Sequence, residues 1–137
     1  MQILALDVGD RTIGIAASDG LMLTAQGIET IRRTSLEKDL ARLQELSKQY
    51  EADTFVIGLP KNMNGTEGDR CNIVREFALK LQETFPEIKI IFWDERLSTV
   101  AAARSLIAAD VSRAKRRKVI DKMAAVFILQ GYLDSRR

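Results

Sequence analysis

The sequence has no histidine, a single cysteine and only two prolines among its 137 residues. The absence of histidine excludes mechanisms that rely on a Ser-His or Cys-His pair, and any metal site built on imidazole ligands. Cys71 can neither close an internal disulfide nor build a zinc site, so we expect a partly buried free thiol in a reducing cytosol. Aromatic residues amount to only 6% and fall mostly in apolar stretches, so no base-stacking platform is expected.

Long hydrophobic runs are also missing. No apolar stretch approaches the roughly 20 residues of a membrane span, and Asp7 interrupts the first apolar run before a signal peptide could form. We therefore expect a cytoplasmic protein with no membrane partner. A length of 137 residues is ordinary for one domain, which predicts a single domain over residues 1–137.

Charge is distributed unevenly along the chain. The net charge is only +2, yet residues 96–137 contain ten Lys and Arg against three acids, a local balance of +7, whereas residues 1–95 carry −5. Such a basic segment favours a polyanionic partner, although a solvated helix face would show the same run of charge. The basic run consists of Arg113, Lys115, Arg116, Arg117 and Lys118.

The hydrophobic pattern predicts three consecutive strands followed by alternating helices and strands. The first three strands are expected at residues 3–8, 12–18 and 21–31, with Asp19-Gly20 as a hairpin signal. The elements expected after them are a helix opened by the capping box Thr34-x-x-Glu37, a strand at 54–58, a helix at 69–85, a strand at 88–93, and helices at 98–108 and 117–133 separated by the basic run.

This order of elements predicts an α/β fold with a mixed sheet and helices on both faces. Tight turns make the first three strands antiparallel neighbours, and right-handed crossovers place the two later strands beside the first. The compact arrangement has five strands in the order 3-2-1-4-5.

Acidic residues at the ends of the predicted strands are candidates for chemistry. Asp7 lies near the carboxyl end of a central strand, where a buried carboxylate needs a metal, a cation or backbone donors, unless it simply caps the turn at Gly9. Asp94 and Glu95 directly follow another strand, at the edge where ligands bind to such sheets. Because side chains alternate between the two faces of a strand, only one of these two acids is expected to point into a site. Their spacing does not show which one, and a solvated strand end without a functional role is the alternative.

Asp121 is a third candidate, set between apolar residues at helical spacing. Ala124 and Ala125, one turn later, would let this helix approach the sheet closely; alternatively, Asp121 complements a helix dipole. Three carboxylates brought together need a cation, and oxygen-only ligands select Mg²⁺ or Mn²⁺. Two such ions about 4 Å apart could activate a water and stabilise a leaving oxygen during phosphodiester cleavage.

Several polar residues could hold the substrate strand near these carboxylates. Lys61 and Asn62 lie in the loop 58–65, which follows a strand but lacks the Gly-Lys-Ser/Thr ending of a P-loop. A plain surface loop is the alternative there. Arg11 and Arg96 are similarly placed after strands, and contact with nucleic acid would be mainly to its phosphate backbone.

Four motifs in order resemble the YqgF (RuvX) family of bacterial proteins, from Ile3 to Leu133. The motifs are Asp7-Val-Gly-x-Arg11-x-x-Gly14-Ile-Ala, Ile57-Gly-Leu-Pro60, Asp94-Glu-Arg-Leu-Ser-Thr99 and Lys118-x-x-Asp121-x-x-Ala-Ala125. The resemblance implies an RNase H-like fold related to the Holliday-junction resolvase RuvC. It also implies a metal-dependent nuclease that matures the 5′ end of pre-16S ribosomal RNA, with junction resolution as the older assignment.

Motif matching places Asp7, Glu95 and Asp121 on the acidic triad of the family, as catalytic residues and as ligands of Mg²⁺ or Mn²⁺. The resemblance thereby selects Glu95 over Asp94. Arg11, Lys61, Asn62, Arg96 and the basic run are then expected to hold the strand.

Other functions remain open at this point. Pre-rRNA is the expected partner and a DNA junction the alternative, with ribosome association and a monomer or homodimer both compatible. A nucleotide-binding ATPase or kinase shares the core fold but needs two such domains. A non-catalytic RNA-binding assembly factor would use the basic face alone.

Overall fold

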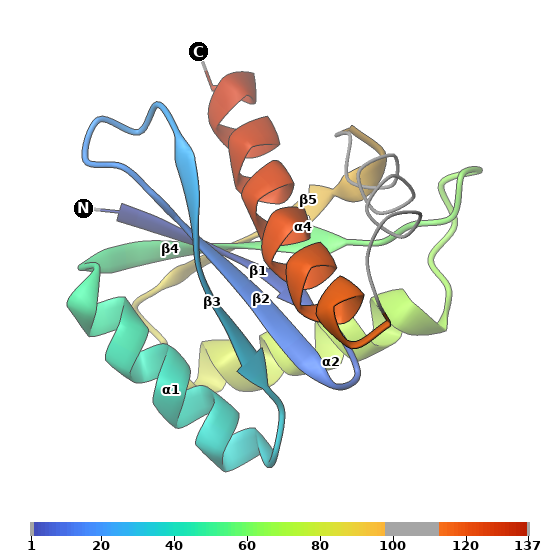
Figure 1. Ribbon diagram of the computed structural model, residues 1–137, viewed down its shortest axis with the longest axis horizontal. Helices are drawn as coiled ribbons and strands as arrows, with labels where there is room; N and C mark the ends of the chain where they lie inside the picture. Colours follow the sequence, from blue (N-terminus) through green and yellow to red (C-terminus); the bar gives the residue numbers. More distant parts are fainter. Residues whose placement is uncertain (1, 98–112, 137) are drawn as a thin grey trace.

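The computed structural model describes residues 2–97 and 113–136, with the backbone alone described for residues 113–121. Within this part of the chain, five strands form one mixed sheet in the order β3-β2-β1-β4-β5 (Figure 1). The strands are β1 (Gln2–Val8), β2 (Thr12–Ser18), β3 (Ala25–Arg32), β4 (Ala52–Leu59) and β5 (Lys89–Asp94). The first three pair antiparallel, while β4 pairs parallel with β1 and β5 with β4. The predicted strand order is confirmed.

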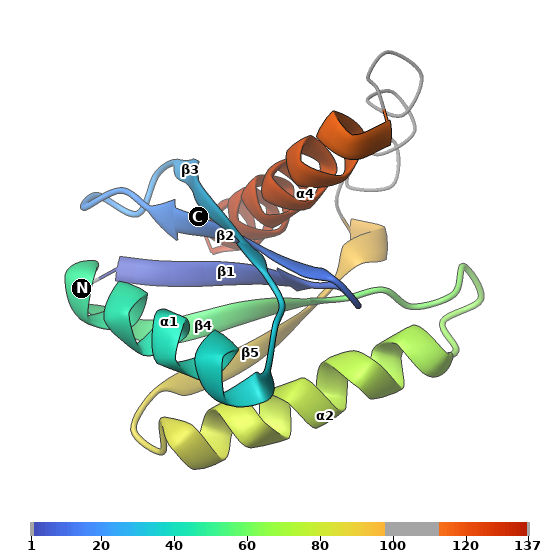
Figure 2. The ribbon, with the colours of Figure 1, turned by 60° about the horizontal axis from the view of Figure 1, so that its bottom comes forward.

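Helices cover both faces of this sheet, as predicted. The helices α1 (Leu36–Gln49) and α2 (Asp69–Thr84) pack on one face, and α4 (Arg113–Ser135) packs on the other (Figure 2). A short 3₁₀ turn, η1 (Glu95–Leu97), follows β5. No described helix combines the length and apolar composition that a membrane span requires.

The central strand β1 is buried on both sides. Its side chains alternate: Leu4 and Leu6 belong to the core under α1 and α2, whereas Ile3 and Ala5 belong to the core under α4. Burial on both faces explains why this strand reads as a continuous apolar run. By the same alternation Asp7 lies on the α4 face of the sheet.

The start of α1 differs from the prediction by one residue. The N-cap is Ser35, whose hydroxyl accepts a hydrogen bond from the backbone N–H of Lys38 at 3.2 Å. The backbone N–H of Thr34, which precedes the cap, donates to Asp39 Oδ1 at 3.3 Å. The capping box assigned to Thr34 was therefore wrong.

The strand β3 begins later than predicted. Asp19 accepts hydrogen bonds from the N–H groups of Leu23 and Thr24 at 2.7 and 3.1 Å, which closes a loop before Ala25. These backbone donors lower the pKa of the Asp19 carboxyl. The Asp19-Gly20 signal marked the connection correctly, but the loop is longer than a two-residue hairpin turn.

The last helix begins earlier than predicted. α4 starts at Arg113, so the basic run forms its first turns and does not separate two helices. Arg, Lys and Ala are strong helix formers, and their propensity carries the helix back through this segment. The helix predicted at 98–108 lies outside the described residues.

The thiol of Cys71 gives a direct test of the packing under α2. Cys71 is fully buried, and burial raises the pKa of its thiol. We expect native protein to react with a thiol reagent at least about a hundredfold more slowly than protein unfolded in urea, because reaction requires opening of the core. Rapid stoichiometric labelling in native buffer would contradict this packing.

Candidate active site at the carboxyl edge of the sheet

The carboxyl ends of β1, β4 and β5 meet at one edge of the sheet, on the right of Figure 1. The helix α4 begins near this edge and runs back toward the amino ends of the strands. Two of the predicted carboxylates lie at the carboxyl ends of these strands: Asp7 near the end of β1 and Glu95 directly after β5. The parallel pairing therefore brings them to a common edge, as expected for ligand sites in such sheets.

Asp7 is buried at this edge and is flanked by glycines on both neighbouring strands. The carboxylate residue is 5% exposed. On β2 its register partner is Gly14, and on β4 the residue after the Leu6–Ile57 pair is Gly58. Neither glycine has a side chain, and at Gly58 the room that a side chain would take is occupied by Ile128, whose Cδ1 would lie 2.4 Å from an added methyl group.

Glu95 lies close to Gly58, the glycine that flanks Asp7 on β4. It is the first residue of η1 and is 7% exposed. A methyl group added at Gly58 would lie 3.3 Å from the carboxyl carbon of Glu95. Since neighbouring strands are about 4.8 Å apart, the Glu95 carboxylate and Asp7 share one small region on the α4 face.

Asp94 is engaged differently from its neighbour Glu95. Its carboxylate accepts the backbone N–H of Arg96 at 3.0 Å and the Arg96 Nη2 at 2.7 Å. These bonds hold the pKa of the Asp94 carboxyl below its usual range. The two acids that spacing left equivalent thus have separate surroundings: Asp94 pairs with Arg96, and Glu95 lies against Gly58.

Asp121 lies within α4, well inside the helix. The helix begins at Arg113, so Asp121 is in its third turn. A charge interacts usefully with the helix dipole only within the first turn, so the alternative reading of Asp121 as a dipole-complementing acid was wrong. Ala124 and Ala125, which follow one turn later, are buried against the sheet as predicted. The side chain of Asp121 lies outside the described part of the chain.

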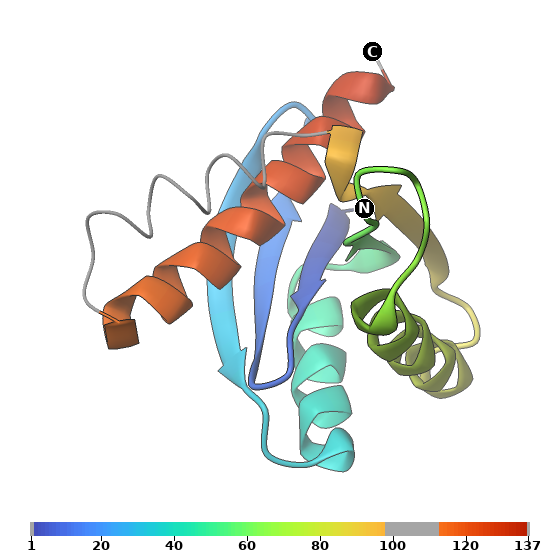
Figure 3. The same cartoon turned by 90° about the vertical axis from the view of Figure 1, so that its right-hand side faces the viewer.

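Lys61 reaches this edge on the loop that follows β4, and Arg96 reaches it on η1 after β5. The Arg96 Nη1 donates to the carbonyl of Met63 at 3.2 Å, which ties η1 to this loop; Figure 3, which looks onto the edge, shows the two side by side. Gly65 has a positive φ of 88° and lies against the same guanidinium. The positive charge of Lys61 contributes to the lowered pKa of Asp94.

Asn62 has a structural role within the loop. Its backbone N–H donates to the carbonyl of Thr66 at 2.9 Å, and its side-chain amide donates to the Thr66 hydroxyl at 2.9 Å. The hydroxyl of Thr66 in turn donates to Asn64 Oδ1 at 2.6 Å. The predicted contact of Asn62 with the substrate stays a prediction.

Arg33 helps to organise this edge, a role that the sequence pattern did not predict. Its Nη1 donates to the carbonyl of Gly9 at 2.9 Å, and its Nε pairs with the buried Asp39 at 3.2 Å. Its backbone N–H also donates to the carbonyl of Arg11 at 2.8 Å. Arg33 therefore fixes the turn that presents the exposed Arg11 at this edge.

The remaining predicted contacts lie at the beginning of α4. The backbone of the basic run forms the first turns of this helix, and its side chains lie outside the described part of the chain. The position of the run still places five cationic residues on the element that begins near the carboxyl edge (Figure 1).

The donor set at the edge suits a hard divalent cation. Among the described side chains no cluster of three potential metal ligands is present, and those side chains do not include that of Asp121. Asp7 and Glu95 are both buried and offer only oxygen donors, on the face of the sheet where Gly14 and Gly58 flank Asp7. Such ligands suit Mg²⁺ or Mn²⁺.

Comparison with known sequences gives extensive matches. The RuvX family model, described as Holliday junction resolvase, matches residues 1–135. A protein of Desulfitobacterium hafniense named "Putative pre-16S rRNA nuclease" is 59% identical over 134 residues, covering 98% of this chain and 92% of that protein. A protein of the same name from Clostridium tetani is 55% identical over 135 residues, covering 98% and 97%.

Comparison with solved structures identifies the fold. Thermus thermophilus RuvC, solved in complex with a Holliday junction substrate, superposes with a TM-score of 0.61 at 13% identity, covering 99% of this chain and 95% of that one. The Holliday junction resolvase of fowlpox virus superposes with a TM-score of 0.56 at 18% identity, covering the whole of both chains. The predicted RNase H-like fold is confirmed.

Proposed function

Because the chain belongs to the RuvX family, we propose that it is a divalent-cation-dependent nuclease that processes the 5′ end of pre-16S ribosomal RNA. The substrate is taken from the names of relatives that are 55% and 59% identical over nearly the whole chain. The observation that carries the proposal is the placement of Asp7 and Glu95, both buried, on one face beside Gly58 at the carboxyl edge of the sheet.

Asp7, Glu95 and Asp121 would hold Mg²⁺ or Mn²⁺. When bound, the ions supply an activated water and neutralise charge on the leaving oxygen. Asp7 lies on a central strand buried on both faces, which gives a ligand of fixed position. Glu95 approaches from η1, and its carboxylate lies next to the position of Gly58. Burial of both carboxylates strengthens their interaction with a cation, because the local dielectric is low.

The surrounding cations would position the strand. Lys61 and Arg96 lie at the same edge and can approach phosphates, while Arg11 extends from the turn that Arg33 fixes. The basic run on the first turns of α4 adds a longer-range attraction for a polyanion. In this arrangement Asn62 acts mainly by keeping the loop in shape.

A DNA junction is the second candidate substrate. It is favoured by the description of the family and by the fold shared with two Holliday junction resolvases. Cutting a four-way junction symmetrically requires two active sites, whereas trimming an RNA end requires one. A dimer on the junction would therefore favour the DNA substrate, and a monomer on the RNA is compatible with trimming of an RNA end.

The test compares cleavage of a labelled 16S precursor fragment with cleavage of a four-way DNA junction. Each substrate is incubated with Mn²⁺, with Mg²⁺ and with EDTA. We expect metal-dependent cutting of the RNA, and sequencing gels of the products will separate endonuclease from exonuclease action. Cutting of the junction alone would overturn the RNA assignment, and binding of both substrates without any cutting would favour a non-catalytic assembly factor.

A further inference from the structure

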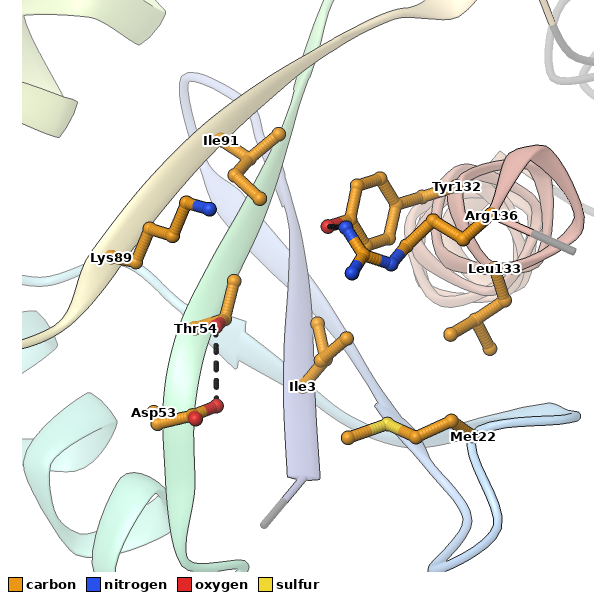
Figure 4. A pocket seen from close by; sticks show the side chains of 9 residues that line it. All are labelled: Ile3, Met22, Asp53, Thr54, Lys89, Ile91, Tyr132, Leu133 and Arg136. Carbon is orange, nitrogen blue, oxygen red and sulfur yellow. Dashed lines mark hydrogen bonds between the residues drawn. The ribbon is translucent and has the colours of Figure 1, made fainter.

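A hollow of about 420 Å³ lies at the opposite edge of the sheet from the carboxylates. It is bounded by the last turns of α4 and by the amino-terminal parts of β1, β4 and β5 (Figure 4). Ile3, which lines it, is four residues before Asp7 on the same strand, a separation of about 13 Å. The volume lies within the range of about 300–1,000 Å³ that is usual for small-molecule sites.

Two cationic groups enter this pocket from opposite sides. Figure 4 shows the Lys89 ammonium and the Arg136 guanidinium directed toward one another across the opening. Among the described side chains, no carboxylate forms an ion pair with either of them. The Arg136 guanidinium is held in place, since its Nη1 donates to the Tyr132 hydroxyl at 2.8 Å and its carbon lies 5.4 Å from the ring centroid. Two converging cations of this kind suit a phosphate group.

Most of the other side chains that line the pocket are apolar. Ile3, Ile91 and Leu133 face the opening, and the ring of Tyr132 lies beside them (Figure 4). An apolar wall next to a planar guanidinium favours a flat ring such as a nucleobase.

A carboxylate at the rim completes the set of polar groups. Asp53 Oδ1 accepts a hydrogen bond from the Thr54 hydroxyl at 3.1 Å, and Figure 4 shows the carboxylate turned toward Thr54 and not toward the two cations. Its remaining lone pairs can accept hydrogen bonds from sugar hydroxyls. A phosphate, an apolar ring and a vicinal diol occur together in a ribonucleotide.

We propose that this pocket binds a ribonucleoside phosphate. The phosphate lies between Lys89 and Arg136, the base lies against Ile3, Ile91 and Leu133, and the ribose hydroxyls reach Asp53. The ligand is either a free nucleotide or one nucleotide of a bound RNA strand. The second source rests on the proposed nuclease function, and the first does not.

The first experiment titrates the protein with AMP, GMP, CMP and UMP in the presence of EDTA, by calorimetry and by NMR. We expect saturable binding of at least one of them, with weaker binding of adenosine, inorganic phosphate and the 2′-deoxynucleotides. K89Q and R136Q should each weaken binding about tenfold, because each removes a charge-assisted hydrogen bond. D53N should reduce the preference for the ribonucleotide.

A matched control removes one lysine charge elsewhere. Lys38 is exposed on α1, which covers the other face of the sheet, so K38Q should leave nucleotide affinity unchanged. Unchanged thermal stability of the variants will show that they are folded. Absence of saturable binding, or equal affinity of the wild type and the K89Q/R136Q double variant, would overturn the proposal.

The second experiment identifies the source of the nucleotide. Affinity for a short single-stranded RNA is measured in EDTA for the wild type and the double variant. A parallel loss of RNA and mononucleotide affinity assigns the pocket to the strand, whereas loss of mononucleotide affinity alone assigns it to a free nucleotide. Neither measurement requires cleavage, so a failure of the nuclease proposal is seen separately in the cleavage assay.

Discussion

D7N should reduce metal-dependent cleavage at least about a thousandfold while changing RNA affinity by no more than about threefold. The asparagine keeps the shape of the side chain but loses the charge that binds a cation. Asp7 is buried on the α4 face between two glycines, so it is not a surface contact for the strand. The measurement is single-turnover cleavage of the 16S precursor fragment beside a filter-binding titration of the same RNA.

Folding offers an independent readout of the same substitution. The melting temperature is measured with and without metal, so that the effect of the cation is separated from the effect of D7N on the metal-free protein. Mn²⁺ should raise the melting temperature of the wild type, because a ligand that binds only the folded state stabilises it. The D7N protein should show a much smaller rise.

Asp94 provides the matched control at the same edge. D94N makes the same chemical change two residues before Arg96, in a carboxylate already bonded to that guanidinium. The D94N protein should keep metal-dependent cleavage and the Mn²⁺ effect on melting. If D94N abolishes both and D7N does not, or if D7N loses RNA binding, the role given to Asp7 as a metal ligand is wrong.

Local patterns in the sequence were sufficient for the order of the strands and for the edge at which the acids lie. The short apolar run in residues 3–8 and the helical periods that follow are short-range signals, and the crossover rule converts them into a topology. Asp7 and Glu95 reach the same edge because β1 and β5 both run parallel to β4, and each acid lies at the carboxyl end of its strand. The choice of Glu95 over Asp94, in contrast, came from the resemblance and not from spacing.

The features that the sequence did not reveal depend on contacts between distant residues. Thr34-x-x-Glu37 matches the capping-box pattern, yet Ser35 caps the helix and the N–H of Thr34 instead bonds to the side chain of Asp39. The bond from Arg33 to the carbonyl of Gly9 joins residues 24 positions apart. No periodicity encodes such a pairing.

Gly58 is the clearest case of a residue whose role appears only in three dimensions. In the sequence it reads as the end of a strand and the beginning of a loop. In the structure an added methyl group would lie 2.4 Å from Ile128 Cδ1 and 3.3 Å from the carboxyl carbon of Glu95. Gly58 therefore sets both how closely α4 approaches the sheet and where Glu95 lies.

G58A should lower the free energy of unfolding by about 1–3 kcal/mol and reduce cleavage more than stability alone explains. Ile128 is fully buried, so it has little room to move away from the new methyl group. The same methyl group pushes the Glu95 carboxylate out of its position beside Asp7. Urea denaturation and single-turnover cleavage, at a temperature where the variant is fully folded, measure the two effects separately.

A double-mutant cycle with I128V separates packing from placement of the carboxylate. Valine lacks the Cδ1 atom that the methyl group would meet at 2.4 Å but keeps a Cγ atom like the one it would meet at 3.0 Å, so G58A/I128V should recover part of the stability lost in G58A. Cleavage should recover less, because the contact with Glu95 at 3.3 Å is still present. G20A is the neutral control, since a methyl group there meets nothing within 4 Å. Full recovery of cleavage together with stability would show that Gly58 serves packing alone and that Glu95 tolerates displacement.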